Sequence, residues 1–368
     1  MLKTFYFFIG TEAELIKVYP LIRKMENSHI PYSIISSGQN DISKSRVLLA
    51  ANGGNIDIVL SDENDIHKSA LGLVGWYICT SKRAVKLICE RFDMQKNHDR
   101  TENVMIVHGD TISTVMGAYI GRKLGMKVAH IEAGLRSHNW LNPFPEEIDR
   151  MLVSRVADYS FAPGRGAANN LKGHKGVYDT KVNTLTDSLK YALSVPCMDE
   201  RINSLEENSY FVFVLHRQEN LENEKLIKTL VSKIEFLSKH IKCVIILHKI
   251  TEIKFRQMGL MEKIEENKQF VLMPRVDYFD FMNLLNNSQF VITDGGSNQE
   301  ELSYMGKPTL IVRKTTERDE GLGKNAVLWG DNDEVINEFI ENPLEYRRQP
   351  SSSDFCPSKF IVDILSGK

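Results

Sequence analysis

Acidic side chains gather in three short segments of the sequence. Asp110 lies in the segment His108-Gly-Asp-Thr, Glu132 lies in His-Ile-Glu-Ala-Gly-Leu-Arg, and Glu146 follows Pro145 in a loop that contains two prolines. Because neighbouring carboxylates repel one another, we expect at least one of them to hold its proton near neutral pH. A site that contains both charged and protonated carboxylates can take a proton from one face of a carbon atom and return one to the other face.

Each of these acids also has a purely structural interpretation. Asp110 could cap the helix expected over 111–124, because an aspartate before a first turn accepts backbone N–H groups. Glu146 could be a first-turn acid that is favoured by the helix dipole. Glu132 has the weakest structural explanation, because it ends an expected buried strand and is followed by Ala-Gly.

A glycine-containing turn stands out in the second half of the chain, Thr293-Asp-Gly-Gly-Ser-Asn-Gln-Glu-Glu301. It follows an expected strand and opens an expected helix, so Gly295 and Gly296 let backbone N–H groups approach an anion at a helix N-terminus. We expect a diphosphate there, with the trailing Gln-Glu-Glu accepting hydrogen bonds from a ribose. A simple tight turn is the alternative.

Two further polar segments follow strands in this half. His216, in His-Arg-Gln-Glu-Asn220, can donate a hydrogen bond to a phosphate oxygen or move a proton. The polar residues beside it favour a functional role over a structural one. Arg313 and Lys314 could neutralise phosphate. Taken alone, that segment is more simply interpreted as a solvated charged loop.

Apolar strands and amphipathic helices alternate around these segments. In the first half we expect strands over 4–9, 32–36, 104–107, 127–131 and 159–162. Between them we expect helices over 12–27, 111–124 and 145–157. The pattern loosens into an expected linker over 184–207. In the second half we expect strands over 210–215, 243–247, 270–273, 289–293 and 309–312, the last of which closes the sheet, and helices over 221–240, 278–287, 298–305 and 358–365.

This repetition predicts an α/β protein with two Rossmann-like domains, each with a parallel sheet covered on both faces. The expected domains are 1–183, which carries the acids, and 184–354, which binds the nucleotide; the segment 355–368 is expected to pack back on the first domain. In such folds ligands bind at the carboxyl ends of the strands, in a cleft between the domains.

Composition excludes several classes of protein. The 368 residues carry a net charge of −2, which argues against a nucleic-acid partner. No apolar run approaches the roughly 20 residues that span a bilayer. The five cysteines form no C-x-x-C pair, so we expect reduced thiols, a cytoplasmic protein and no structural zinc. His108 and His130 lack metal-ligand spacing, and no metal site is expected.

These motifs, in this order, resemble those of the non-hydrolysing UDP-N-acetylglucosamine 2-epimerase family. The resemblance runs from Phe8 to about Gly330 and is densest in the acidic segments, in Pro145-Glu-Glu-Ile-Asp-Arg150, in the segment that begins at His216 and in the glycine turn. Several motifs in the correct order are far more specific than any one of them alone.

The resemblance implies a two-domain GT-B arrangement and an isomerase that interconverts UDP-GlcNAc and UDP-ManNAc, or a close UDP-2-acetamido sugar, for surface polysaccharide synthesis. The reaction that the resemblance implies is an anti-elimination of UDP followed by its re-addition. It implies catalytic roles for Asp110, Glu132, Glu146 and His216, and substrate binding by Lys17, Arg136, Arg150, Gly295, Gly296, Ser297, Glu301 and Arg313. It also implies no redox cofactor and a homodimer.

The sequence departs from the family pattern at three loops, one of which is Ser37-Gly-Gln-Asn-Asp41 after the second expected strand. Glu12 stands where the family has an arginine that contacts the diphosphate, a reversal worth several kcal/mol at ~4 Å and an effective dielectric constant of about 20. The glycine turn reads Asp294-Gly-Gly-Ser-Asn where the family has Asp-Ser-Gly-Gly-Ile. The altered loops motivate a GT-B glycosyltransferase as an alternative, and Glu12 motivates a non-catalytic UDP-sugar binding protein. The retained acids favour the epimerase.

Overall fold

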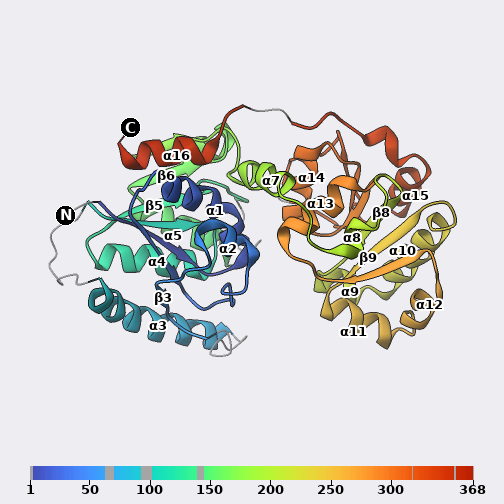
Figure 1. Ribbon diagram of the computed structural model, residues 1–368, viewed down its shortest axis with the longest axis horizontal. Coiled ribbons are helices and arrows are strands. Elements are labelled where there is room, and N and C mark those ends of the chain that lie inside the picture. Colours follow the sequence, from blue (N-terminus) through green and yellow to red (C-terminus); the bar gives the residue numbers. More distant parts are fainter. Residues whose placement is uncertain are drawn as a thin grey trace. The chain divides into compact units, whose positions relative to one another are not determined.

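The structure, a computed structural model, describes residues 3–62, 70–92, 102–138, 145–316, 318–351 and 354–367. The chain forms two compact units (Figure 1). Unit 1 comprises Met1–Ser188 together with Phe355–Lys368, and unit 2 comprises Leu189–Asp354. The C-terminal segment therefore belongs to the same unit as the N-terminus.

Unit 1 is built on a parallel sheet in the order β3-β2-β1-β4-β5-β6-β7. Its strands are β1 (Phe5–Ile9), β2 (Tyr32–Ser36), β3 (Ile58–Val59), β4 (Val104–His108), β5 (Lys127–Ile131), β6 (Tyr159–Ala162) and β7 (Val177–Asp179). Every residue of β1 and β4 is buried, as is typical of central strands in a sheet with both faces covered. The expected strands of this half are confirmed to within one residue at each end.

The helices of unit 1 pack against both faces of this sheet. They are α1 (Glu12–Asn27), α2 (Arg46–Asn52), α3 (Ala70–Arg91), α4 (Ile112–Lys123), α5 (Glu146–Val156), α6 (Arg165–Asn170), α7 (Leu185–Ser194), whose last residues belong to unit 2, and α16 (Pro357–Ser366). Tyr6 and Phe8 pack in one cluster with Met116 of α4, so alternate residues of β1 face the opposite side. A Cβ at Gly117 would lie 2.7 Å from the Phe8 ring, so α4 lies closer to β1 than alanine would permit.

Unit 2 repeats the plan with a parallel sheet in the order β10-β9-β8-β11-β12-β13. Its strands are β8 (Tyr210–Val214), β9 (Lys242–Leu247), β10 (Phe270–Pro274), β11 (Val291–Thr293), β12 (Thr309–Ile311) and β13 (Ala326–Leu328). Its remaining helices are α8 (Glu200–Asn203), α9 (Gln218–Glu222), α10 (Glu224–Leu237), α11 (Lys249–Gln257), α12 (Met261–Glu266), α13 (Tyr278–Asn287), α14 (Gly296–Met305), α15 (Asp333–Glu341) and a 3₁₀ turn (Pro343–Tyr346).

Two expectations about elements are wrong. The helix expected over 221–240 is two helices, because Asn223 leaves helical geometry (φ −85°, ψ 85°) and its side chain caps α10 by accepting from the Leu226 N–H at 3.1 Å. Strand β12 does not close the sheet, since β13 lies beyond it. The boundary between the two units, after Ser188, falls inside the linker expected over 184–207, and this segment also contains α7 and α8.

Helix α16 packs against α1 in unit 1. Its first turn is held by Asp187, whose Oδ2 accepts from the Ser358 N–H at 2.8 Å and from the Ser358 hydroxyl at 2.5 Å. At its other end, Lys3 Nζ donates to the Leu365 carbonyl at 2.6 Å. The two ends of the chain are therefore joined within one unit.

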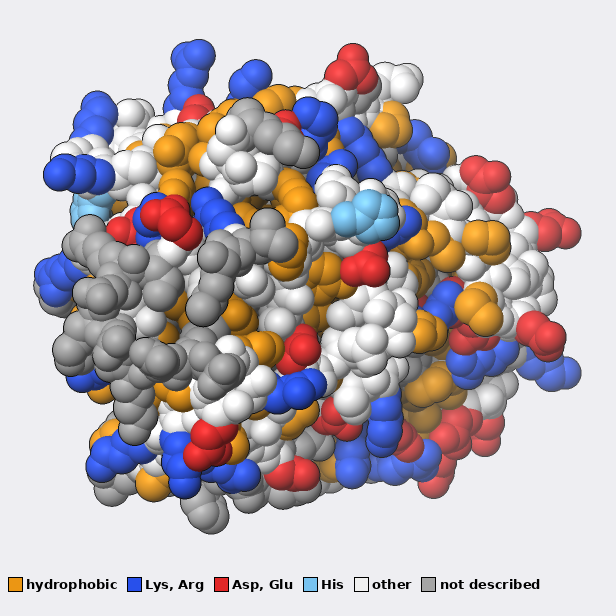
Figure 2. Space-filling model, turned by 60° about the vertical axis from the view of Figure 1, so that its left-hand side comes forward, with side chains coloured by type: hydrophobic (Ala, Val, Ile, Leu, Met, Phe, Trp, Pro, Cys, Tyr) orange, Lys and Arg blue, Asp and Glu red, His pale blue; other side chains and the backbone are white. Residues whose placement is uncertain are grey.

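Charged side chains of both signs are interspersed on the face drawn in Figure 2, in line with the net charge of −2. None of the helices in the described ranges combines the length and the apolar character that are needed to cross a membrane. All five cysteines lie in the described part of the chain and carry free thiols. Cys243 is fully buried in the core of unit 2, as expected.

Candidate active site

The carboxyl ends of three neighbouring strands, β1, β4 and β5, carry the polar segments of unit 1. Strand β1 has β2 on one side and β4 on the other. Strands β2 and β3 are therefore added on one side of β1, and β4 to β7 are added on the other. In open α/β sheets, ligands bind at such a switch point. Gly10, Asp110 and Glu132 follow the three strands at this edge.

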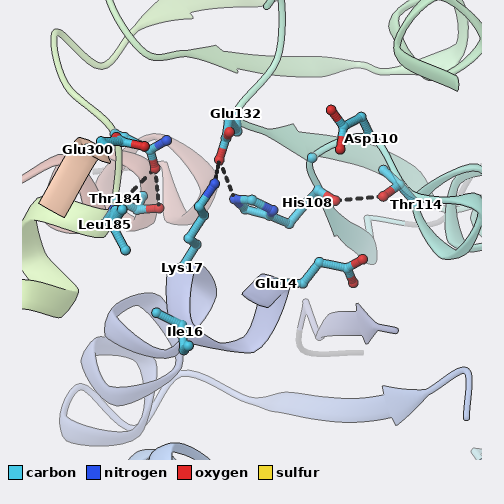
Figure 3. A network of polar contacts seen from close by, with 12 residues as sticks. Glu14, Ile16, Lys17, His108, Asp110, Thr114, Glu132, Thr184, Leu185 and Glu300 are labelled. Atoms are coloured by element: carbon cyan, nitrogen blue, oxygen red, sulfur yellow. Dashed lines mark hydrogen bonds and ion pairs between the residues drawn. The ribbon is translucent and has the colours of Figure 1, made fainter. Parts of the chain in front are cut away.

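Glu132 is held in place by two buried partners from other elements. Its Oε2 lies 2.5 Å from Lys17 Nζ on α1 and 3.1 Å from His108 Nε2 at the end of β4 (Figure 3). The side chains of Lys17 and Glu132 are only 9% and 7% exposed. Glu132 also has φ 62°, a left-handed conformation that is costly for a residue with a Cβ and that concentrates at functional sites.

The two histidines beside this acid are buried and neutral near pH 7. Burial lowers the pKa of His108, although Glu132 opposes the shift. Burial also lowers the pKa of His130 to about 4, and its Nε2 lies 2.7 Å from the Gly109 carbonyl oxygen. Their contribution to the site is therefore position and hydrogen bonding, without positive charge.

Asp110 pairs with Arg150, which reaches it from α5. Arg150 Nε donates to Asp110 Oδ2 at 2.9 Å and Nη2 donates to the same oxygen. The structural alternative for Asp110 does not hold, because Thr111 caps α4 through a reciprocal pair of hydrogen bonds with Thr114. The Asp110 carboxylate is thus left to Arg150 and to the site.

The start of α5 supplies further acids. Glu146 is its first residue, and its Oε2 is buried with no hydrogen-bond partner in the described structure. Glu147, which the sequence argument does not single out, is fully buried and accepts from Arg136 Nε at 2.5 Å and from the Ser137 N–H at 3.1 Å. Burial alone would raise the pKa of Glu147, but the bonds from Arg136 and Ser137 and the charge of Arg150 bring it below its ordinary value.

Glu14 is another buried acid that sequence reasoning missed. Its Oε2 accepts from the Gly10 N–H at 2.7 Å and its Oε1 accepts from the Thr111 hydroxyl at 2.6 Å. Burial raises the pKa of Glu14 to about 7, against the effect of these hydrogen bonds. Its carboxyl group joins the loops that follow β1 and β4.

In unit 2, Asp294 organises the segment that contains His216. It is fully buried at the end of β11 and accepts from the backbone N–H groups of His216 and Arg217 and from Asn220 Nδ2, at 2.9 to 3.2 Å. His216 Nδ1 lies 3.1 Å from Asp294 Oδ1, and the imidazole stacks on His248 with ring centroids 5.0 Å apart. Burial alone would raise the pKa of Asp294, but the contacts with His216, Arg217 and Asn220 lower it. The pKa of Asp294 therefore lies below its ordinary value.

The glycine turn forms the N-terminus of α14, where Gly295 is the cap and Gly296 and Ser297 begin the helix. Gly295 has φ −80°, so its backbone is open to any residue; a Cβ there would lie 2.3 Å from Asn298 Oδ1 and 3.3 Å from His216 Cε1, so the Asn298 side chain would have to move. Three unsatisfied N–H groups at the start of a ten-residue helix can bind an anion.

Polar residues of α14 and of the loop after β12 are already engaged with one another. Glu301, a predicted ribose ligand, accepts from Asn298 Nδ2 at 3.2 Å. Arg313 Nη1 lies 3.4 Å from the Thr316 hydroxyl, which in turn donates to Gln299 Oε1 at 2.9 Å. Gln299 therefore connects α14 to the loop that carries Arg313.

Among the described residues, no group of three or more His, Cys, Asp and Glu side chains is arranged to hold a metal ion. The arrangement in unit 1 can exchange protons with a bound molecule, and the N-terminus of α14 with His216 can receive phosphate. Comparison with known proteins gives these capacities a context. A family model described as UDP-N-acetylglucosamine 2-epimerase matches residues 25–360.

The chain belongs to the UDP-N-acetylglucosamine 2-epimerase family. This is a family of isomerases. The chain is 31% identical over 377 residues to a UDP-N-acetylglucosamine 2-epimerase of Methanococcus maripaludis, covering 98% of this chain and 97% of that protein. It is 30% identical over 356 residues to the enzyme of the same name from Methanocaldococcus jannaschii, covering 92% of each.

A solved structure of the Methanocaldococcus jannaschii epimerase, in complex with UDP-GlcNAc and UDP, matches all of both chains with a TM-score of 0.76 and 27% identity. This likeness, with the two parallel sheets, confirms the predicted α/β class with two Rossmann-like units of the GT-B type. Glu12 Oε1 accepts from the Ser45 hydroxyl at 3.4 Å.

Proposed function

We propose that this member of the epimerase family interconverts UDP-GlcNAc and UDP-ManNAc, or a close UDP-2-acetamido sugar. Family membership and the likeness to an epimerase solved with UDP-GlcNAc and UDP support the substrate class. The observation that carries the reaction type is the set of carboxyl groups at the carboxyl ends of β4 and β5 and at the start of α5.

The proposed reaction proceeds through elimination, because the C2 proton is not made acidic by a neighbouring carbonyl. A carboxylate takes the proton from C2 while the bond between C1 and the UDP oxygen breaks, which gives a 2-acetamidoglucal and UDP. UDP then re-adds at C1 while a carboxylic acid delivers a proton to the other face of C2. Two acids on opposite faces of the sugar are required.

We assign these proton transfers to Asp110, Glu132 and Glu146. Arg150 holds Asp110, and Lys17 holds Glu132, so both carboxyl groups are positioned by buried or partly buried cations. Arg136 acts through Glu147 in this assignment, since their side chains are bonded. Positioned groups lower the entropic cost of reaching the transition state.

We assign UDP binding to unit 2. His216, oriented by Asp294, donates to the departing diphosphate, which also receives the N–H groups of Gly296 and Ser297 at the start of α14. Gly295 contributes as the helix cap, and its own N–H donates to the Thr293 hydroxyl at 3.0 Å. Arg313 adds positive charge and Glu301 accepts from the ribose. No redox cofactor enters this reaction, because the sugar is neither oxidised nor reduced overall.

The decisive experiment incubates the full chain with UDP-GlcNAc in D2O and follows deuterium at C2 by NMR. We expect deuterium at C2 and the appearance of the C2 epimer without any acceptor. Asp110→Asn, Glu132→Gln and Glu146→Gln should each abolish exchange while UDP binding, measured by calorimetry, is retained. UDP release that requires an acceptor sugar would identify a glycosyltransferase, and binding without turnover of any UDP-HexNAc would identify a binding protein.

The same proposal includes the biological setting that the family resemblance implies. The product would supply surface polysaccharide synthesis in the cytoplasm, and the active form would be a homodimer. Sedimentation of the purified chain tests the dimer, and loss of the corresponding sugar from the cell surface on gene deletion tests the setting.

A further inference from the structure

Asp149 is a buried acid at the start of α5 to which the proposed reaction assigns no role. It lies three residues after Glu146, and Arg150 lies four residues after Glu146. Residues three or four apart share one face of a helix. Because Arg150 reaches Asp110 from this face, the spacing brings Asp149 to the same surroundings as Glu146 and Asp110.

The surroundings of Asp149 do not favour a negative charge. Only 8% of the residue is exposed, and its Oδ2 is buried with no hydrogen-bond partner among the described residues. Glu146 Oε2 is buried in the same way. A buried carboxylate without a donor has lost the stabilisation that water gives its charge, whereas the neutral acid loses far less.

The two arginines near the first turn of α5, Arg136 and Arg150, already bind other acids. Arg150 binds Asp110 and lies 3.5 Å from Glu147, and Arg136 binds Glu147. No ion pair in the described ranges joins a cation to Asp149. Two arginines therefore serve two other acids, and a further negative charge would be unbalanced.

The titratable groups that face Asp149 come from three places. Asp110 follows β4, Glu146 lies on the same helix, and Tyr77 lies on α3. Burial, then Asp110, then Glu146 raise the pKa of Asp149 to about 7. Burial and neighbouring groups raise the pKa of Tyr77, so the phenol is neutral in this range.

We propose that Asp149 is a positioning residue of the epimerase site that must be neutral for Asp110 and Glu146 to exchange protons with the sugar. The proposal rests on the proposed function. When Asp149 is neutral it adds no negative charge beside Asp110, which Arg150 holds, or beside Glu146. When Asp149 ionises, its charge opposes ionisation of its neighbours, which disfavours the base form that the reaction needs.

The test compares the pH dependence of C2 deuterium exchange in wild type and Asp149→Asn, because asparagine keeps the shape of the acid but cannot ionise. We expect similar rates near pH 6. The ratio of variant to wild-type rate should then rise roughly tenfold by pH 8, since a group of pKa near 7 is about one-tenth neutral there. A ratio that stays constant across this range would overturn the proposal.

Asp158→Asn is the matched control. Asp158 pairs with Arg122 and accepts a hydrogen bond from the Val128 N–H at 2.8 Å. Asp158 directly precedes β6, so it lies at the amino ends of the strands, opposite to the carboxyl ends that carry the proposed site. We expect its pH profile to follow wild type. If both variants changed the profile alike, the effect would not belong to Asp149.

A second measurement remains decisive if Asp149→Asn fails to fold or if wild type shows no exchange. Wild type labelled with ¹³C at the aspartate carboxyl carbons should show one aspartate that titrates near pH 7. Its absence would overturn the proposal whatever the enzyme catalyses. No exchange with any UDP-HexNAc, in the presence of that titration, would instead contradict the proposed function alone.

Discussion

At the scale of single residues, Glu14 shows how burial sets the charge of an acid. Its carboxyl group is fully buried and receives two hydrogen bonds, from the Gly10 N–H and the Thr111 hydroxyl. Burial outweighs both, and the folded pKa of about 7 lies above the ordinary 4.5. The folded protein therefore binds more protons than the unfolded chain between these two values.

Replacing Glu14 with glutamine should reveal this linkage. The contribution of Glu14 to the free energy of unfolding is fully present below pH 4.5 and is lost as the pH rises through 7. Over that range the free energy of unfolding of wild type should therefore fall by up to about 3 kcal/mol relative to that of Glu14→Gln. Urea unfolding at a series of pH values measures the difference. The control Glu90→Gln, at an exposed position on α3, should run parallel to wild type; parallel curves for Glu14→Gln itself would contradict the assignment.

Replacing Lys17 with methionine tests the buried ion pair. The change keeps most of the side-chain volume but removes the cation from Glu132, and loss of one partner of a buried pair typically costs about 3 kcal/mol or more. Unfolding free energy should fall accordingly, and C2 exchange should be lost. Lys127→Met, which breaks an exposed pair with Glu102, should leave stability unchanged within error. Equal stability of Lys17→Met and wild type would show that the pair is well solvated.

The sequence names most of the charged residues at this edge of the sheet but does not reveal which of them bind one another. Crowded acids predict a raised carboxyl pKa, and the raised values fall on Glu14 and Asp149, neither of which the spacing singles out. Arg136 is predicted to bind substrate, yet it holds Glu147. Burial and pairing depend on how α1 and α5 meet β4 and β5, which the residue order does not disclose.

At the scale of elements, the cap of α4 can be tested directly. Thr111 Oγ1 accepts from the Thr114 N–H and donates to Glu14, so Thr111→Ala should cost about 1–2 kcal/mol of unfolding free energy. Thr111→Ser keeps the hydroxyl and should behave nearly as wild type. Faster hydrogen exchange in the first turn of α4 should accompany the alanine variant alone. Equal losses in both variants would assign the effect to the methyl group.

Long apolar runs in the sequence predict the central strands, whereas short or polar elements are not predicted. The apolar character of β1, and of β4 up to His108, predicts these strands well, because both faces of the sheet are covered. Strand β13 has only three residues and follows a polar loop. Helix α7 lies in the segment that the sequence predicts as a linker, although Leu185, Leu189 and Ala192 are buried at helical spacing. A single asparagine side chain decides the break between α9 and α10.

At the scale of the whole molecule, unit 1 is assembled from two distant parts of the chain. Helix α16 lies beside α1 in Figure 1, although about nine-tenths of the sequence separates them. Ile361, Val362 and Leu365 are buried on this contact, and Asp187 bonds the first turn of α16. The sequence predicts a helix at this end of the chain, but its place depends on which apolar surfaces the rest of unit 1 leaves uncovered.

Ending the chain at Asp354 should therefore destabilise unit 1 selectively. Burial of Ile361, Val362 and Leu365 is worth about 1.5–3 kcal/mol each, which together approaches the roughly 5–15 kcal/mol that holds a typical domain folded. Hydrogen exchange read by mass spectrometry should show faster exchange in the peptides of 3–188, with those of 189–354 protected as in wild type. A chain that ends at Gly367 keeps α16 and should match wild type. Equal loss of protection in both units would mean that they unfold as one cooperative body, because α16 belongs to only one of them.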